Sequence, residues 1–485
     1  MKTTIITIII IFALHLSSYS QHNGHEHHNS NTDSTEHKTD TIKAEDKEMH
    51  DHNDHQDESK DSLHTNMDSN KTDMDGMEEI DHNMHMPSMS MDHIYSLNLP
   101  MSRNGSGTAW MPDATPMFGY MAHSGSWMFM FHGSIFLRYN SQDITKEGSR
   151  GASKFDAPNW FMVMGQSKVG SSGLFGFSSM FSLDPITVGG EGYPLLFQSG
   201  ETWEGKPLVD RQHPHNFFSE LSIGYTQSFS KKTDLNIYLG YPGEPALGPV
   251  AFMHRLSSSF NPDSPLGHHW QDATHITFGV ATLGFRYDKV KVEGSIFTGR
   301  EPSEKRYGFD EPKFDSYSLR VNFNPMQELA TQVSYGFVKS PESSHPNEDV
   351  KKTTASIIHS KKFLGNSFLA SSIVFGMNDA GGDHKENSLL LESAYSFNKN
   401  AVYGRFEWVQ RSGEELLIEG AHDEIYNINA LTLGYNRELY KFSNTIINAG
   451  LQGSVFFPDK ELEQIYGKMP LSAEVYIRFS PGMEH

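Results

Sequence analysis

Histidine, methionine and aspartate are concentrated in residues 21–95, in short groups that could bind metal ions. The groups read HNGHEHH from residue 22, HDHNDH from residue 50, MDGM from residue 74 and MHMPSMSMDH from residue 84. Imidazole suits Cu(II), Zn(II) and Ni(II), whereas the thioether of methionine suits Cu(I). The mixture favours copper, which needs ligands in two oxidation states. The candidate ligands are His22, His25, His27, His28, His50, His52, His55, Met74, Met77, His82, Met84, His85, Met86, Met89, Met91 and His93.

The surroundings of these ligands decide how tightly they can bind. Residues 21–95 hold 19 acidic residues against 5 lysines and contain almost no aromatic or β-branched apolar residues. Such a segment cannot bury enough surface to fold, so we expect it to be disordered. Because it cannot preorganise a geometry, copper ions, with zinc and nickel as alternatives, should bind weakly at several interchangeable sites. The alternative interpretation is a solvated acidic linker whose histidines and methionines have no role.

A second concentration of histidine lies far downstream, in two long stretches. They read WEGKPLVDRQHPHNFF from residue 203 and YPGEPALGPVAFMHRLSSSFNPDSPLGHHWQDATHITF from residue 241. Their proline, glycine and apolar side chains favour loops that fold inward over loops that extend into solvent. The histidines could form a metal site in the interior, or they could only hydrogen-bond the folded loops. The candidate ligands of this loop or lumen site are His213, His215, Met253, His254, His268, His269, Asp272 and His275.

The elements that carry these loops show alternation with a period of two. In GSWMFMFHGSIFLRY the aromatic residues Trp127 and Phe129 share one face, and in SYSLRVNF so do Tyr317, Leu319 and Val321. Period two is typical of strands with one apolar and one polar face. Similar segments recur along the chain, among them residues 274–287, 366–376 and 387–397, and predict about 16 strands, within a range of about 14 to 18.

The links between these segments alternate in length. Residues 140–158 form a long link and residues 168–172 a short one, then residues 184–215 form a long link and residues 230–232 a short one. Outer-membrane barrels have an even number of antiparallel strands, short periplasmic turns and long outer loops. The pattern therefore predicts an all-β fold, a transmembrane antiparallel β-barrel. A soluble β-sandwich or propeller has no reason to place every long loop at one end, and its strands are shorter.

Composition divides the chain into four segments. Residues 1–20 have one lysine, an apolar run and small residues before Gln21, which is the layout of a secretory signal peptide. Residues 21–95 are the disordered tail, residues 96–124 a linker or plug, and residues 125–485 the barrel. We expect the barrel in the outer membrane of a Gram-negative bacterium, in contact with lipid, and the tail in the periplasm. The net charge of −21 argues against nucleic acid as a partner.

The order of a signal peptide, a tail with MDGM and MHMPSMSMDH, and a β-rich remainder resembles that of the outer-membrane copper-resistance proteins of the B type. The segments DRQHPHNFF, YPGEPALGPVAFMHR and GHHWQDATHITFG are also similar to those of a widespread, poorly characterised family of exported β-barrel proteins. The first resemblance implies a role in holding or exporting excess copper at the outer membrane. The second implies no established site residues.

Two functions fit this organisation. The first is metal binding, tolerance or efflux, in which the periplasmic tail captures copper and the barrel offers a path or a docking point for periplasmic metal carriers or efflux components. The alternative is a general porin or solute channel with an incidental acidic tail. We do not expect an enzyme, because neither an H-E-x-x-H nor a G-x-S-x-G arrangement occurs in the sequence.

Overall fold

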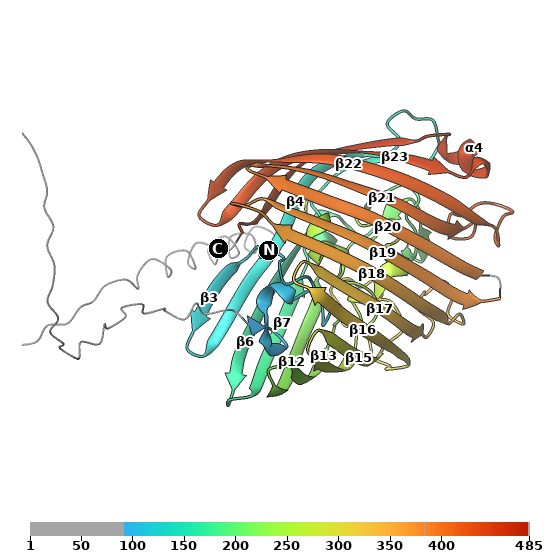
Figure 1. Ribbon diagram of the computed structural model, residues 1–485. Coiled ribbons are helices and arrows are strands. Elements are labelled where there is room, and N and C mark those ends of the chain that lie inside the picture. Colours follow the sequence, from blue (N-terminus) through green and yellow to red (C-terminus); the bar gives the residue numbers. More distant parts are fainter. Residues whose placement is uncertain (1–91, 383, 484–485) are drawn as a thin grey trace, which may run out of the picture. The chain divides into compact units, whose positions relative to one another are not determined.

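The computed structural model describes residues 92–382 and 384–483 (Figure 1). The predicted signal peptide and all candidate ligands of the tail except His93 lie outside the described residues. Two short paired strands come first, β1 (Asp92–His93) and β2 (Ser96–Pro100), and Tyr95 between them is buried. The described fold therefore already includes the last residues of the segment that composition assigns to the tail.

Sixteen long strands form the wall of a closed antiparallel barrel (Figure 1). Of the 18 strands in the barrel, only β3 (Tyr120–Ser124) and β5 (Ser153–Asp156) are short, and both pair with β4. Consecutive long strands pair with each other, and β24 pairs with β4 to close the barrel. The predicted fold class and strand number are confirmed. The long strands are β4 (Trp127–Ser141), β6 (Asn159–Val169), β7 (Gly173–Phe181), β12 (Phe218–Ser230), β13 (Thr233–Gly240), β14 (Val280–Tyr287), β15 (Val290–Phe297), β16 (Ser316–Met326), β17 (Leu329–Val338), β18 (Val350–Lys362), β19 (Phe368–Gly381), β20 (His384–Phe397), β21 (Asn400–Ser412), β22 (Ile425–Phe442), β23 (Thr445–Pro458) and β24 (Leu471–Pro481).

The apolar side chains of the strands face outward. On β16, Tyr317 and Leu319 are 56% and 54% exposed, whereas Ser318 and Arg320 between and beside them are buried. Strands β14, β15 and β17 show the same alternation. A soluble sheet buries its apolar face, while a barrel in a bilayer presents that face to lipid and keeps a polar interior. The chain is therefore an outer-membrane β-barrel.

The two ends of the barrel differ in the length of their connections. At one end lie short turns, such as residues 231–232 between β12 and β13 and residues 288–289 between β14 and β15. At the other end lie long loops, such as residues 182–217 between β7 and β12 and residues 241–279 between β13 and β14. The predicted alternation has one exception: residues 382–383 alone join β19 to β20, because both strands extend beyond their predicted bounds. Long loops of such barrels face the exterior and short turns face the periplasm.

Three segments fill the lumen: residues 94–118 and the two longest loops, 182–217 and 241–279. In the first segment, the side chain of Thr108 accepts a hydrogen bond of 2.9 Å from Arg320 on the wall strand β16. In the last, the indole ring of Trp270 is buried beneath the guanidinium group of Arg411 on β21, at 4.0 Å. Residues 96–118 thus lie inside the barrel, whereas β3, which follows them, belongs to the wall.

Short elements shape these segments and the other loops. None of the described helices is long and apolar enough to cross a membrane. The short elements are η1 (Met101–Arg103), α2 (Asp184–Thr187), β8 (Tyr193–Pro194), β9 (Glu201–Trp203), β10 (Lys206–Leu208), β11 (Arg211–Gln212), η2 (Phe252–His254), η3 (Leu256–Ser258), α3 (His268–Gln271), η4 (Ala273–His275), η5 (Lys460–Leu462) and α4 (Glu463–Tyr466).

Candidate metal centre

Five histidines of the two longest loops lie side by side in the lumen. The distances between ring centroids are 5.5 Å for His213 and His269, 5.1 Å for His269 and His268, and 5.0 Å for His268 and His275. They are 5.7 Å for His275 and His215, and 6.5 Å for His215 and His213. The five imidazoles therefore follow one another in a closed circle, which we call the histidine cluster.

Local sequence explains how each loop contributes to the histidine cluster. His213 precedes Pro214, which favours an extended backbone, and in an extended backbone residues two apart point to the same side. His213 and His215 can therefore face the same space. In the other loop, His268 and His269 occupy α3 and His275 ends η4, so two short helical turns present three rings.

Oxygen atoms hold three of the rings through Nδ1. His215 Nδ1 lies 2.8 Å from Asp184 Oδ2, and His268 Nδ1 lies 2.5 Å from Asp272 Oδ1. His275 Nδ1 lies 2.8 Å from the backbone oxygen of Asp272. An Nδ1–H group that donates to oxygen leaves Nε2 as the atom with a free lone pair. This arrangement orients metal-binding histidines in proteins and raises their basicity.

Most of the other ring nitrogens of the histidine cluster lack a hydrogen-bond partner among the described residues. His213 Nδ1 lies 3.1 Å from Glu201 Oε1. The Nε2 atoms of His213, His215 and His275 are buried and have no hydrogen-bond partner among the described residues, and both ring nitrogens of His269 share that state. Buried polar atoms are almost always paired, so each exception calls for an explanation.

Burial keeps three rings of the histidine cluster neutral. Desolvation, with smaller effects from neighbouring charges, lowers the pKa of His269 and His275 to about 3 and that of His213 well below its usual range. Metal ions bind neutral imidazole. At neutral pH these rings are therefore already in the protonation state that a metal ligand requires.

Three members of the histidine cluster are close enough to share an ion. One donor atom from each of His213, His268 and His269 lies within 4.8 Å of the other two. Nitrogen ligands of a single zinc-sized ion are about 3 to 4 Å apart, so small side-chain rotations suffice. The cavity among these rings measures about 10 Å³, which is the space of about one water-sized particle. Glu301 and Arg306 also line this cavity.

Buried contacts fix the carboxylate that holds His268. Oδ2 of Asp272 accepts hydrogen bonds from the Phe252 backbone N–H at 2.9 Å and from Arg255 at 3.1 Å. The same Arg255 donates to Glu392 of the wall strand β20 at 2.8 Å. A chain of paired buried charges thus runs from the barrel wall to the ring of His268, and this chain limits how far the ring can move.

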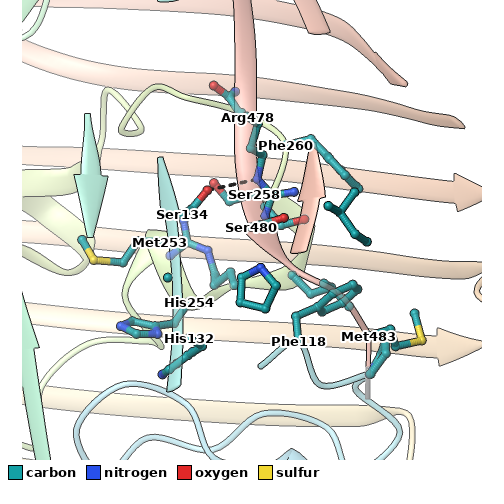
Figure 2. A pocket seen from close by; sticks show the side chains of 18 of the residues that line it. Phe118, His132, Ser134, Met253, His254, Ser258, Phe260, Arg478, Ser480 and Met483 are labelled. Atoms are coloured by element: carbon teal, nitrogen blue, oxygen red, sulfur yellow. Dashed lines mark hydrogen bonds between the residues drawn. The ribbon is translucent and has the colours of Figure 1, made fainter. Parts of the chain in front are cut away.

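A larger cavity of about 230 Å³ adjoins the histidine cluster, because His215 and Asp184 line it too. Figure 2 shows His132, Met253 and His254 on its wall. The ring of His254 lies 5.7 Å from that of His132, and Nε2 of His132 is buried without a hydrogen-bond partner. We call this space the methionine cavity; its methionines are Met101, Met111, Met117, Met130, Met164, Met253 and Met483.

The methionine cavity extends toward the short-turn end of the barrel. Ser480 and Met483, at the end of β24, line it, and so do Asn398 and Lys399 in the short turn between β20 and β21. The methionine cavity therefore reaches from the periplasmic end of the lumen to His215 of the histidine cluster and its partner Asp184.

The structure brings together six of the eight candidate residues of the loop or lumen site: His213, His215, His268, His269, Asp272 and His275. Met253 and His254 lie instead in the methionine cavity. His93, a candidate ligand of the tail, is buried, and its Nδ1 accepts a hydrogen bond of 2.9 Å from the Tyr95 backbone N–H.

Sequence reasoning did not find the carboxylates Asp184, Glu201 and Glu301, nor His132 on the wall strand β4. Asp184 and Glu201 lie in the same loop as His213 and His215 but away from them in sequence, whereas Glu301 and His132 lie in other segments. None of the four has a histidine beside it in the sequence. Asp272, which the sequence did offer as a candidate, follows His268 by four residues, and one turn of helix brings the two together.

No protein-family profile matches the chain, and no curated protein matches it. Outer-membrane proteins are among the solved structures that are similar to this chain. OmpT of Vibrio cholerae is 10% identical, with 74% of this chain and 99% of that chain covered and a TM-score of 0.42. The anion-selective porin from Comamonas acidovorans is 12% identical, covering 73% and 99%, with a TM-score of 0.45. OmpF of Salmonella typhi, in complex with daunomycin, is 10% identical, covering 74% and 100%, with a TM-score of 0.43. Nothing among these similarities supports the resemblance to copper-resistance proteins.

Proposed function

We propose that this chain is a porin-like outer-membrane barrel that binds a transition-metal ion in its lumen at the histidine cluster. The observation that carries the proposal is the group of His213, His268 and His269, whose donor atoms lie within 4.8 Å of one another, together with the buried, unpaired Nε2 of His213 and ring nitrogens of His269 among the described residues. Leaving a buried polar atom unpaired costs about 1–3 kcal/mol. A bound ion offsets that cost at several atoms at once.

The side chains suggest the class of ion. Imidazole donors suit Cu(II), Zn(II) and Ni(II), and the thioethers of the neighbouring methionine cavity suit Cu(I). Copper is our principal candidate, because these two adjoining sets of ligands together serve both of its oxidation states. Binding is reversible coordination without covalent chemistry: Asp184, Glu201 and Asp272 hold the rings, while His213, His268 and His269 donate to the ion.

The test is metal stoichiometry of the purified full-length protein in detergent. We expect His268→Ala protein to bind about one copper or zinc ion less per chain than the wild type, since the removed ring has a central place in the cluster. His123→Ala is the matched control, because His123 is an exposed histidine on β3. Both variants keep the same tail, so tail-bound metal cancels in the comparison. Equal stoichiometry in all three proteins contradicts the proposal.

A second candidate function is a general solute channel with an incidental tail. The observation in its favour is the methionine cavity, a space of about 230 Å³ inside the lumen that is lined in part by residues of the short-turn end. The two functions differ in living cells. For metal handling, a deletion strain loses copper tolerance, and full-length protein restores it better than His268→Ala protein does. For a plain channel, neither variant changes tolerance to any metal.

We further propose that residues 21–91 act as a periplasmic arm that captures copper for the barrel or for periplasmic carriers and efflux components. The support is the recurrence of His and Met in this segment and the position of Asp92 at the short-turn end, where its carboxylate lies 3.3 Å from Lys168 near the end of β6. Deletion of residues 21–91 should lower copper tolerance in the same growth assay. Unchanged copper tolerance at full barrel expression contradicts only the proposed role of the arm. It does not contradict metal binding at the histidine cluster.

A further inference from the structure

Carboxylates and histidines of three outer loops form a continuous series that leads inward to the histidine cluster. In the loop between β21 and β22, His422 Nε2 lies 3.0 Å from Glu414 Oε1. The same carboxylate lies 2.8 Å from His345 Nε2 in the loop between β17 and β18, and His345 Nδ1 lies 3.3 Å from Glu342. Four side chains from two loops are therefore linked by direct contacts.

The backbone continues the series from Glu342 to the third loop. The N–H of Glu301, between β15 and β16, donates to the carbonyl oxygen of Pro341 at 3.0 Å, which places Glu301 beside Glu342. Glu301 Oε1 in turn lies 3.7 Å from His269 Nδ1 of the histidine cluster. Glu301 also lines the small cavity among the histidines.

Side-chain exposure falls steadily along this series. It is 68% at His422, 36% at Glu414 and 32% at His345. It continues at 29% for Glu342, then 14% at Glu301 and 6% at His269. Ion pairs that only stabilise a surface loop do not require side-chain exposure to fall from one residue to the next. A series of residues that leads from solvent to a buried site does require this decrease.

The inner end of the series carries an independent sign of a ligand. His269 is buried, both of its ring nitrogens lack hydrogen-bond partners, and one of them faces Glu301. The nearest cations are engaged elsewhere: Lys352 donates to the backbone oxygen of His269 at 2.8 Å, and Arg306 pairs with Glu201. In the described part of the chain, His269 is therefore the only basic residue with a side-chain nitrogen within 4.0 Å of the Glu301 carboxylate.

We propose that Glu414, Glu342 and Glu301 form the access route by which a divalent cation passes from the outer end of the barrel to the histidine cluster. The inference rests on the proposed metal-binding function of that cluster. Rings and rows of carboxylates attract cations and replace part of their hydration shell. The arriving cation competes with His345 for Glu414 and Glu342, and His269 then takes it from Glu301.

The test separates the rate of metal loading from the affinity of the site. Co(II) is mixed with purified full-length protein, and visible absorption follows its binding to histidine; the cluster's share is the signal that His268→Ala protein lacks. We expect Glu342→Gln and Glu414→Gln to slow loading of the cluster about tenfold by loss of electrostatic attraction. Co(II) affinity should stay within about twofold of the wild type, because the cluster's own ligands are intact.

A matched control comes from the same loop as Glu414. Glu419 is exposed, and Glu419→Gln removes the same charge, so it should load at the wild-type rate. Wild-type loading kinetics in both Glu342→Gln and Glu414→Gln proteins overturn the access route while the metal site stands. An absence of any cluster signal in the wild type overturns the proposed function instead. If the substitutions prevent folding, the salt dependence of wild-type loading decides: a rate independent of ionic strength overturns the route.

Discussion

Asp272 holds two members of the histidine cluster at once, His268 through its carboxylate and His275 through its backbone oxygen. Substitution Asp272→Asn removes the charge that fixes the His268 tautomer and faces Arg255 with an amide. We expect metal affinity to fall about 10- to 100-fold, the usual effect of losing such a partner. Competitive Co(II) titration measures the change.

The control for this substitution is Asp156→Asn on β5. Asp156 forms an equally buried ion pair with Arg138, at 2.7 Å, and no hydrogen bond or ion pair among the described residues joins it to the histidine cluster. It should lower stability and leave metal affinity unchanged. If both variants lose affinity to the same degree, Asp272 acts through general stability and not through His268.

His345 gives the outer loops a pH dependence. Hydrogen bonding to Glu342, and more weakly to Glu414, raises the pKa of His345 to about 9. Because the folded-state pKa is raised above the ordinary value of about 6.5, this bridge contributes fully below that value and is lost as pH rises through 9. Limited proteolysis of residues 339–349 and 413–424 should accelerate between pH 7 and 10.

The comparison for this experiment is His345→Gln protein at each pH, which cancels the pH dependence of the protease itself. Glutamine can hydrogen-bond but carries no charge. The loops of His345→Gln protein should be cleaved at the same rate, relative to the activity of the protease, between pH 7 and 10. If the loops of the wild type and of this variant are cleaved at the same rate at every pH, the His345 bridge does not hold the loops.

At the scale of residues, the sequence predicts the histidine cluster better than its supports. His213 and His215 belong to one HPH string and His268 and His269 to one HH pair, so the candidates were visible as local patterns. Glu201 contacts His213 because their shared loop folds back on itself, and Glu301 contacts His269 because two different loops meet. Such long-range contacts leave no trace in local spacing.

At the scale of elements, the outward apolar face of the strands predicts how substitutions behave. Leu319, within β16, is 54% exposed on the lipid side. Leu319→Arg should destabilise the barrel in lipid vesicles by about 2–4 kcal/mol, the cost of placing arginine near the middle of the bilayer. Urea unfolding measures it. Leu364→Arg, in a short turn where Leu364 is 97% exposed, should cost almost nothing.

The alternation of apolar and polar residues predicts where strands occur, but it does not predict where they begin and end. Each of the sixteen predicted segments corresponds to one long strand. The segment predicted to begin at residue 274 starts as β14 only at Val280, because η4 turns the preceding residues inward to present His275. Period two identifies a strand wherever one face meets lipid, but it cannot mark where packing inside the lumen takes over.

At the scale of the whole molecule, the filled lumen predicts a poor conductor. An open barrel of about 16 strands encloses an aqueous channel, whereas here residues 94–118 and two loops occupy the interior. Planar-bilayer recordings of the purified protein should give a conductance far below that of an open porin of the same strand number. A conductance equal to that of an open porin contradicts the filled lumen.

The pairing of β24 with β4 has a consequence for assembly. The wall closes where residues 135–141 of β4 meet residues 473–479 of β24, so the first and last long strands of the chain share the final seam. Residues 94–118 are made before any long strand, yet they end up enclosed by all of them. The seam between β4 and β24 must therefore form when residues 94–118 already lie between the strands. If β4 paired with β24 before residues 94–118 had entered the lumen, this segment would be left outside the barrel.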